Sequence, residues 1–324
     1  MPAFISRRFA AMVVLCTLGC RAAFAADEFP SRALRMIVPY SAGSFSDALC
    51  RELAAGMSAH LNQPVTIDNI PGAGATIGMA RAKAAPPDGY TIVYVGSSAI
   101  INVSLMPQVP YDPLKDFRYI GLIGYTNYVL ASHPGRPFAD FAGMLARAKA
   151  APNTLTIASP GNGTASHLSA EIMKKAAGIN ARHVPYKGSS PAVNDLVAGH
   201  VDMMMDPQTT LGPFVRAGRL RGLAVTGSQR MRELPDVPTL SELGIKGLEV
   251  PLGWFGMAAP AGTPDAVMTR LHAAMSAAME RSTGKLGELG VQIGFGSADA
   301  FRRFVESEVP RYGRIVDETG VKLE

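Results

Sequence analysis

Short apolar segments that favour strands alternate along the chain with longer segments whose apolar residues recur at helical spacing. Residues 34–38 read LRMIV and form the first strand-like segment. The next stretch carries Leu49, Leu53 and Met57 four residues apart, a spacing typical of one face of a helix, and residues 65–67 are again strand-like. Because strands that alternate with helices usually pair in parallel beneath a layer of helices, the pattern predicts an α/β fold with mostly parallel sheets.

The same order of strand, small-residue loop and helix occurs twice. LRMIVPYSAGSFSDALCRELAAGM, which begins at Leu34, has the pattern of LTIASPGNGTASHLSAEIMKKAAG, which begins at Leu155. Two more strand, loop and helix units follow each of these segments in matching order. The offset of about 120 residues is far longer than the period of stacked repeats, so it indicates two similar lobes, although α/β units also resemble one another by chance.

The chain after the second copy returns to strands and helices, which most economically complete the first lobe. We therefore expect a discontinuous lobe 1 of residues 26–125 and 227–324, and a lobe 2 of residues 126–226. Chain crossings between two such lobes form a hinge. The last helix is expected to end or bend near Val309, because Pro310 has no N–H group to continue the helical hydrogen bonds.

The first 25 residues have the pattern of a secretory signal peptide. Two arginines precede an apolar run over residues 9–18, and an A-F-A tripeptide ends at Ala25. The apolar run is too short to cross a bilayer, and no later stretch is long and apolar enough to do so. We expect export and cleavage after Ala25. Lipoprotein processing at Cys20 is the alternative, but Thr17 stands where an aliphatic residue is expected.

Cleavage changes both the charge and the cysteine content of the chain. The formal net charge is +5, and the leader contains three arginines and no acidic residue, so the mature charge is +2. No basic stripe remains, and a nucleic-acid partner is not expected. Cys50 is left as a single cysteine that shares a helix face with apolar residues, so it is predicted to be buried and outside any intramolecular disulfide.

Three glycine-rich turns each follow a strand and open a helix, and they cover residues 42–46, 161–164 and 188–190. Backbone N–H groups at a helix start attract anions, and ligands of open α/β sheets bind at the carboxyl ends of the strands. The turns therefore predict a site for a carboxylate or a phosphate. The alternative is that Ser46, Thr164 and Ser190 only cap their own helices.

The common catalytic and cofactor motifs do not occur. The P-loop, G-x-S-x-G and H-E-x-x-H patterns are missing, and IPGAGATIG has the spacing G-x-G-x-x-x-G, which predicts a tight turn rather than a dinucleotide site. The histidines are scattered, so no metal or cofactor is expected, and His167 is expected to pack or to face solvent. Asp206 ends the apolar run MMM, and on the cleft side it could accept a hydrogen bond from a ligand amine or hydroxyl.

Several segments together resemble the periplasmic solute-binding receptors of tripartite tricarboxylate transporters, often called Bug proteins. They include PSRALRMIVPYSAGSFSD, IDNIPGAGATIGMARAKAAPPDGYTIVY, IASPGNGTASHLSAEIMKKAAG and GWFGMAAPAGTP. The resemblance implies a two-lobed Venus-flytrap fold, with a mostly parallel sheet flanked by helices in each lobe. It also implies a periplasmic receptor that closes on a small organic acid, delivers it to a membrane permease and has no catalytic activity. We expect a monomer.

The resemblance further implies which residues hold the ligand. The expected set is Tyr40, Ser44, Phe45, Ser46, Asp47, Ser97, Ser98, Gly161, Gly163, Thr164, Tyr186, Gly188 and Asp206. Within it, the Thr164 hydroxyl and the N–H groups of residues 163–166 are expected to hold one carboxylate. Ser44 and Phe45 stand where the family has a second glycine and a small polar residue. The Phe45 ring at the ligand mouth would favour a flat or apolar ligand body over small dicarboxylates.

Two other function classes use the same residues. One is a secreted enzyme that acts on carboxylic acids through a constellation around His167 and Asp206, although no nucleophile, base and orienting group stand at a recognisable spacing. The other is a periplasmic sensor subunit that passes its ligand state to a kinase. Its binding chemistry is that of a transport receptor, so the sequence does not separate the two.

Overall fold

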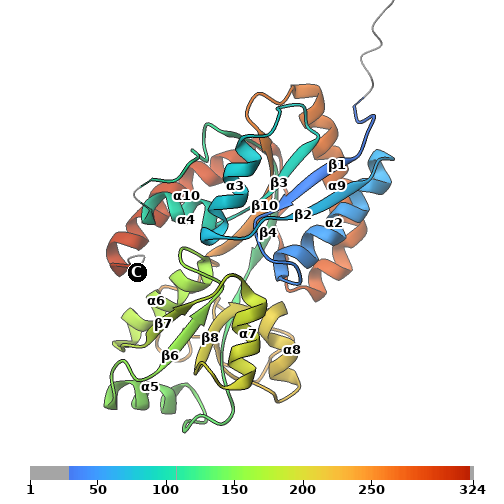
Figure 1. Ribbon diagram of the computed structural model, residues 1–324. Helices are drawn as coiled ribbons and strands as arrows, with labels where there is room; N and C mark the ends of the chain where they lie inside the picture. Colours follow the sequence, from blue (N-terminus) through green and yellow to red (C-terminus); the bar gives the residue numbers. More distant parts are fainter. Residues whose placement is uncertain (1–28, 107, 322–324) are drawn as a thin grey trace, which may run out of the picture.

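The computed structural model describes residues 29–106 and 108–321, which form two α/β lobes, one above the other in Figure 1. The predictions for the signal peptide, its cleavage after Ala25 and processing at Cys20 fall outside the described residues. In the two described ranges, every helix is too short or too polar to span a membrane.

Six strands form the first sheet, in the order β11-β4-β10-β3-β1-β2. β1 pairs in parallel with β2 and β3, whereas β10 runs antiparallel to β3 and β4. Helices α2 and α9 cover one face of this sheet, with Cys50 of α2 buried as predicted, and α3, α4 and α10 cover the other (Figure 1). The bounds are β1 (Leu34–Val38), α2 (Phe45–Leu61), β2 (Val65–Asn69), η1 (Ala73–Ala75), α3 (Thr76–Lys83), β3 (Thr91–Gly96), α4 (Ser98–Leu105), β4 (Phe117–Thr126), β10 (Gly253–Pro260), α9 (Asp265–Glu288), β11 (Gln292–Ile293) and α10 (Ala298–Thr319).

The second sheet has five strands in the order β7-β6-β8-β5-β9. β6 pairs in parallel with β7 and β8, and β5 runs antiparallel to β8 and β9. Helices α5 and α6 pack on one face, and α7 and α8 on the other. The bounds are β5 (Tyr128–Ser132), α5 (Phe141–Ala150), β6 (Thr156–Ser159), α6 (Ala165–Ala177), β7 (Arg182–Pro185), α7 (Ser189–Ala198), β8 (Met203–Pro207), α8 (Gln208–Arg216) and β9 (Arg221–Val225).

The two sheets share one topology, which confirms the predicted internal repeat. The first strand of each copy lies between the second and the third, as β2-β1-β3 and β7-β6-β8, and an antiparallel strand, β10 or β5, pairs with the third. Helices α2, α3 and α4 follow their strands in the same order as α6, α7 and α8. Because each helix follows a parallel strand, its N-terminus lies near the carboxyl end of that strand.

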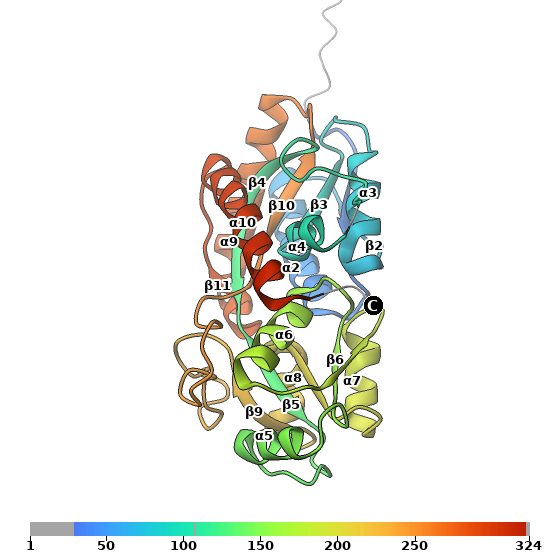
Figure 2. The same cartoon turned by 90° about the vertical axis from the view of Figure 1, so that its left-hand side faces the viewer.

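The chain crosses between the lobes at two places. Asn127 separates β4 from β5, and the second crossing leads into β10. The segment between β9 and β10 lies beside β9 in the lower lobe (Figure 2), where Leu240 N donates to Val225 O at 2.8 Å. Its apolar side chains pack on the second sheet, so the predicted return to lobe 1 at residue 227 comes too early. We propose residues 128–252 as lobe 2.

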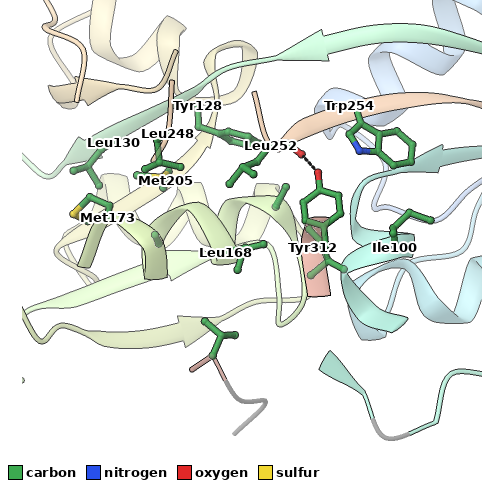
Figure 3. Packing of buried hydrophobic residues seen from close by; sticks show 14 of the residues in the cluster. Ile100, Tyr128, Leu130, Leu168, Met173, Met205, Leu248, Leu252, Trp254 and Tyr312 are labelled. Atoms are coloured by element: carbon green, nitrogen blue, oxygen red, sulfur yellow. Dashed lines mark hydrogen bonds between the residues drawn. The ribbon is translucent and has the colours of Figure 1, made fainter. Parts of the chain in front are cut away.

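Helix α10 holds the second crossing in place. The Tyr312 hydroxyl donates to the Leu252 carbonyl at 2.5 Å, directly before β10 begins (Figure 3). Trp254, at the start of β10, donates its Nε1 hydrogen to the buried Glu308 carboxylate at 2.9 Å. Both bonds join α10 to the strand that re-enters lobe 1, so this end of β10 is anchored on the side of the first lobe.

The prediction that the last helix ends near Pro310 is wrong, because α10 runs from Ala298 to Thr319. Phe301 and Val305 before the proline and Tyr312 after it are all buried on one face. This packing spans the proline and offsets the single helical hydrogen bond that the missing N–H group removes.

Candidate ligand-binding site

A cavity lies between the lobes, and residues of both lobes line it. Both lobes contribute to it through the ends of strands and the starts of helices. Its lining is Tyr40, Ser44, Phe45, Ser46, Tyr94, Gly96, Ser97, Ser98, Thr126, Tyr128, Pro160, Thr164, Ala165, Ser166, Ser189, Asp206, Pro207, Gly253, Trp254 and Phe255.

Helix α2 presents its first turn to this cavity. The Ser44 side chain caps the helix and accepts a hydrogen bond from Asp47 N at 3.2 Å. The predicted capping role of Ser46 is therefore wrong, because the helix begins two residues earlier. Within the described part of the chain, the N–H groups of Phe45 and Ser46 donate to no protein acceptor. They are two donors from lobe 1 that a ligand can use.

Asp47 does not line the cavity but organises the turn in front of it. Its carboxylate accepts hydrogen bonds from Gly43 N at 2.9 Å, Arg51 Nε at 3.0 Å and Asn69 Nδ2 at 3.0 Å. Burial acts to raise the pKa of Asp47, but these bonds outweigh it and hold the pKa below its ordinary value. Asp47 therefore stays ionised and fixes the loop from which the α2 donors emerge.

Helix α6 repeats this arrangement in lobe 2, with one correction to the prediction. The Thr164 Oγ1 accepts from His167 N at 3.2 Å and donates to Gly161 O at 2.8 Å. The hydroxyl hydrogen is thus used inside the turn and is not available to a ligand carboxylate. In the described residues, the N–H groups of Ala165 and Ser166 have no protein acceptor, so they are the donors of this turn.

Helices α4 and α7 also begin at the cavity, with Ser98 and Ser189 in its lining. The cap of α7 is Gly188, so the predicted cap at Ser190 is wrong. Tyr40 donates its hydroxyl hydrogen to Ser98 Oγ at 3.0 Å, which leaves the Ser98 hydroxyl hydrogen free to turn into the cavity. Among the described lining residues, none is lysine, arginine or histidine. The site therefore presents oriented backbone dipoles, rather than a formal positive charge, to the carboxylate of a ligand.

Asp206 carries the one carboxyl group in the described lining, and its exposed fraction is 0 %. Ser166 Oγ donates to its Oδ1 at 2.8 Å, whereas no described residue donates to Oδ2 in hydrogen-bond geometry. Burial raises the pKa of Asp206 to about 6, although the nearby hydroxyls of Ser189, Ser166 and Thr210 act to lower it. The carboxyl group is therefore removed from water, and among the described residues only one of its two oxygens accepts a hydrogen bond.

Aromatic rings form the lobe 1 wall of the cavity. Phe45 packs edge-to-face on Phe255 with ring centroids 5.1 Å apart, and Tyr40 does so on Tyr94 at 5.8 Å. The Phe45 ring is buried in the core of lobe 1 rather than standing free at the mouth. These rings and Trp254 give a ligand body flat, apolar surfaces behind the polar helix starts.

The structure brings most of the predicted ligand residues to this cavity, but not all of them. Gly161, Tyr186 and Gly188 line a neighbouring inter-lobe cavity. The Tyr186 hydroxyl donates to Asp195 at 2.6 Å. A Cβ atom at Gly188 would lie 2.3 Å from the Ser41 Oγ of the other lobe, so this glycine is a point of contact between the lobes.

Gly163 is likewise at a lobe contact rather than in the cavity lining. A Cβ atom there would lie 1.7 Å from Asn102 Oδ1 of α4. The neighbouring IPGAGATIG segment forms η1 and a tight turn, as predicted, and a Cβ atom at Gly74 would lie 2.4 Å from the Asn162 carbonyl oxygen. The lobes therefore touch through closely packed backbone, and the structure is a closed form.

Several lining residues were missed by the sequence reasoning. Thr126 and Tyr128 flank the crossing residue Asn127, so the predicted crossing itself could have pointed to them. Tyr94 and Phe255 read as ordinary strand residues in the sequence. Their approach to the cavity follows from the pairing of β3 with β10, which are far apart in the chain.

His167 does not share the cavity with Asp206. Its ring is buried, stacks on His183 with centroids 3.9 Å apart, and accepts a hydrogen bond from Gly163 N on Nδ1 at 3.3 Å. Burial first, and Lys174 second, lower the pKa of His167 to about 4, so the ring is neutral and structural near pH 7. In the described ranges, no three histidine, cysteine or acidic side chains cluster as metal ligands would.

Two α/β lobes that are joined by crossing strands, with a cavity between them at which helices begin, define the class of periplasmic-type solute-binding proteins. The chain matches the family model of the tripartite tricarboxylate transporter family receptor over residues 49–321, and it belongs to this family. Members of the family are periplasmic binding receptors, and the predicted fold and family are confirmed.

Three solved structures resemble this chain over most of its length. The periplasmic binding protein BugD is 32% identical, with a TM-score of 0.86, and the match covers 91% of this chain and 100% of that one. Rpa4515 of R. palustris with adipate is 32% identical at a TM-score of 0.86, covering 91% and 99%. MatC of Rhodopseudomonas palustris with bound malate is 30% identical at a TM-score of 0.83, covering 89% and 100%.

Proposed function

We propose that the protein is a monomeric receptor that captures a small organic acid between its lobes in the periplasm and delivers it to the permease subunits of a tripartite transporter. The observation that carries this proposal is the convergence of helices α2, α4, α6 and α7 on one cavity, whose described lining holds no basic side chain. Helix N-termini are complementary to carboxylates without a formal cation.

The strength of such binding comes from several hydrogen bonds acting together. A hydrogen bond to a charged group contributes about 1.5 to 3 kcal/mol, so donors from both lobes supply useful affinity. The ligand carboxylate leaves without breaking an ion pair to a basic side chain, since the described lining contains none. A receptor that hands its ligand to a permease needs both properties, because it must bind at low concentration and still release on docking.

The ligands of the related structures support a carboxylate. Rpa4515 was solved with adipate and MatC with malate, and this chain has a cavity between its two lobes. The wall of Phe45, Tyr94 and Phe255 adds apolar surface to the site. We therefore include aromatic monoacids and diacids among the candidate ligands, beside adipate, malate and citrate.

We propose that the residues in direct reach of the ligand are the cavity members of the predicted set. They are Tyr40, Ser44, Phe45, Ser46, Ser97, Ser98, Thr164 and Asp206. Ala165 and Ser166 join them through their backbone N–H groups. Asp47 and the lobe-contact glycines act by shaping the turns and the closed form.

Thermal-shift screening with a panel of these acids tests the proposal. At least one acid should stabilise the protein, because a ligand at 100 times its Kd adds about 2.7 kcal/mol to the free energy of unfolding. Trp254 is the single tryptophan of the chain and lines the cavity, so its fluorescence should titrate with the same acid. The proposal is wrong if the binders are confined to sugars, metals or amines without a carboxylate.

Delivery is tested in cells. Deleting the gene should abolish uptake of the acid found in the screen, and a plasmid copy should restore it. Uptake that continues unchanged, together with loss of an acid-induced transcriptional response, would instead assign the receptor to a sensor.

A further inference from the structure

The carboxyl group of Asp206 stands at the end of β8 in a cavity that is otherwise lined by donors and apolar rings. The side chain is fully buried, Oδ1 accepts from Ser166, and Oδ2 has no partner in hydrogen-bond geometry among the described residues, although the hydroxyls of Ser189 and Thr210 lie near the carboxyl. Buried polar atoms in proteins are nearly always hydrogen-bonded, so this one calls for a partner. Its place in the cavity lining points to the ligand.

An ionised carboxylate only accepts hydrogen bonds, so it discriminates between ligand groups. A second carboxylate of a ligand placed beside it would bring two negative charges together out of water, and the described lining supplies no lysine, arginine or histidine to offset them. A ligand amine, by contrast, arrives protonated and both pairs with Oδ2 and neutralises it. The arrangement therefore favours a positively charged ligand group beside Asp206 and disfavours a negatively charged one.

We propose that Asp206 is the specificity-determining residue of the site and selects acids that carry a cationic amine. This inference rests on the proposed function. The ligand carboxylate lies at the N-termini of α2 and α6, and the amine donates to Asp206. The preferred ligand class is thus an amino-carboxylate zwitterion rather than a plain dicarboxylate. A ligand hydroxyl in the same place donates one neutral hydrogen bond and is the weaker substitute.

Two further observations fit this assignment. Ser166 contributes its backbone N–H group to the cavity and its hydroxyl to Asp206, so one residue couples the carboxylate end of the site to the amine end. Burial raises the pKa of Asp206 to about 6, and a cationic amine within hydrogen-bond distance would bring it down again by stabilising the ionised form. The interaction with a bound amine thereby offsets the free energy needed to keep the ionised carboxylate out of water.

Matched ligand pairs that differ in one group test the proposal. Adipate is compared with 2-aminoadipate, and succinate with malate and aspartate, by isothermal titration and Trp254 fluorescence. The amino acid of each set should bind at least tenfold more tightly than its plain diacid, with malate between succinate and aspartate. Equal binding within both sets, or tighter binding of the plain diacids, would overturn the role of Asp206.

Asp206→Asn should reduce the amino-acid preference to about one or invert it, because an amide is neutral and also donates. Asp140→Asn is the matched control, since Asp140 caps α5 outside the cavity lining and asparagine caps a helix equally well. It should keep the wild-type preference. If Asp206→Asn does not fold by circular dichroism, Asp206→Ser is measured instead, since it also removes the charge. A wild-type preference in the folded variant refutes the assignment.

The outcome also separates this proposal from the one on which it rests. If plain and amino acids bind equally, only the assignment of Asp206 fails. If no acid of either kind binds the wild-type protein, the carboxylate function fails, and the assignment fails with it.

Discussion

Replacing Gly163 by alanine should hold the two lobes apart. The glycine lies in the α6 turn of lobe 2 and faces Asn102 of lobe 1, and an added Cβ atom would lie 1.7 Å from Asn102 Oδ1. Asn102 has no room to yield, because it is fully buried and its Nδ2 donates to Gly74 O at 2.6 Å. The contact joins the two lobes, so we expect the clash to act on their approach rather than on the fold of either lobe.

The size of the effect follows from this distance. Real Cβ atoms do not approach other heavy atoms closer than 3.0 Å, so the surfaces must separate by more than 1 Å at this point. Overpacking of this kind costs about 1 to 3 kcal/mol, which corresponds to a loss of affinity of roughly 5- to 150-fold if the penalty falls on the closed form. The left-handed backbone at Gly163 also strains an alanine there by about 1 to 2 kcal/mol. This strain lowers the stability of the open and closed forms equally, so it does not change the affinity.

A matched control isolates the clash from the backbone cost. Gly178 has a similar positive φ of 62°, and no atom lies within 4 Å of the position of its Cβ. Gly178→Ala should therefore lose stability but keep affinity for the best acid of the screen. The double variant Asn102→Ala with Gly163→Ala removes the opposing oxygen and should recover part of the lost affinity.

Small-angle scattering with and without saturating acid measures closure directly. Wild type and Gly178→Ala should show a falling radius of gyration, and Gly163→Ala should remain extended or close only at much higher ligand concentration. Wild-type affinity and full compaction in Gly163→Ala would refute the reasoning.

Three further predictions concern capping, ionisation and export. Thr164→Val should lower the free energy of unfolding by about 1 kcal/mol in urea titrations through loss of the α6 cap, and rescue by Thr164→Ser would assign the effect to the hydroxyl. Because the folded pKa of Asp206 is about 6 against an ordinary value of 3.8, its contribution to stability is full below pH 3.8 and falls as pH rises to 6, by about 3 kcal/mol. The stability of Asp206→Asn relative to wild type should rise by this amount from pH 3.5 to 7.5, and a constant difference would contradict it. Intact mass of exported protein should begin at Ala26, whereas a lipidated Cys20 would contradict cleavage after Ala25.

The architecture could be predicted because its signals are local. Each strand, glycine turn and helix start of the repeat lies within about 25 consecutive residues, and the turn residues themselves mark the N-termini. The repeat then placed those N-termini in equivalent positions of two lobes. Thr164 as a cap, the tight turn at 72–75 and the burial of Cys50 all belong to this local level.

The details of the site could not be predicted because they depend on contacts between distant segments. The Thr164 hydroxyl is occupied by Gly161 O, and Asp47 is turned away by Arg51 and Asn69, neither of which a helix-start pattern reveals. The continuation of α10 past Pro310 likewise depends on the surfaces that its buried face meets. In each case tertiary packing decides what a local rule leaves open.

The placement of donors explains why binding and closure are one event. The N–H groups of Phe45 and Ser46 belong to lobe 1, and those of Ala165 and Ser166 belong to lobe 2, so a carboxylate that reaches both holds the lobes together. The apparent affinity is then the intrinsic affinity of the closed site multiplied by the closed fraction. A change at the lobe contact, such as Gly163→Ala, alters only the closed fraction and should weaken every ligand by the same factor. A change at Asp206 alters the intrinsic term and should change the order of the ligands.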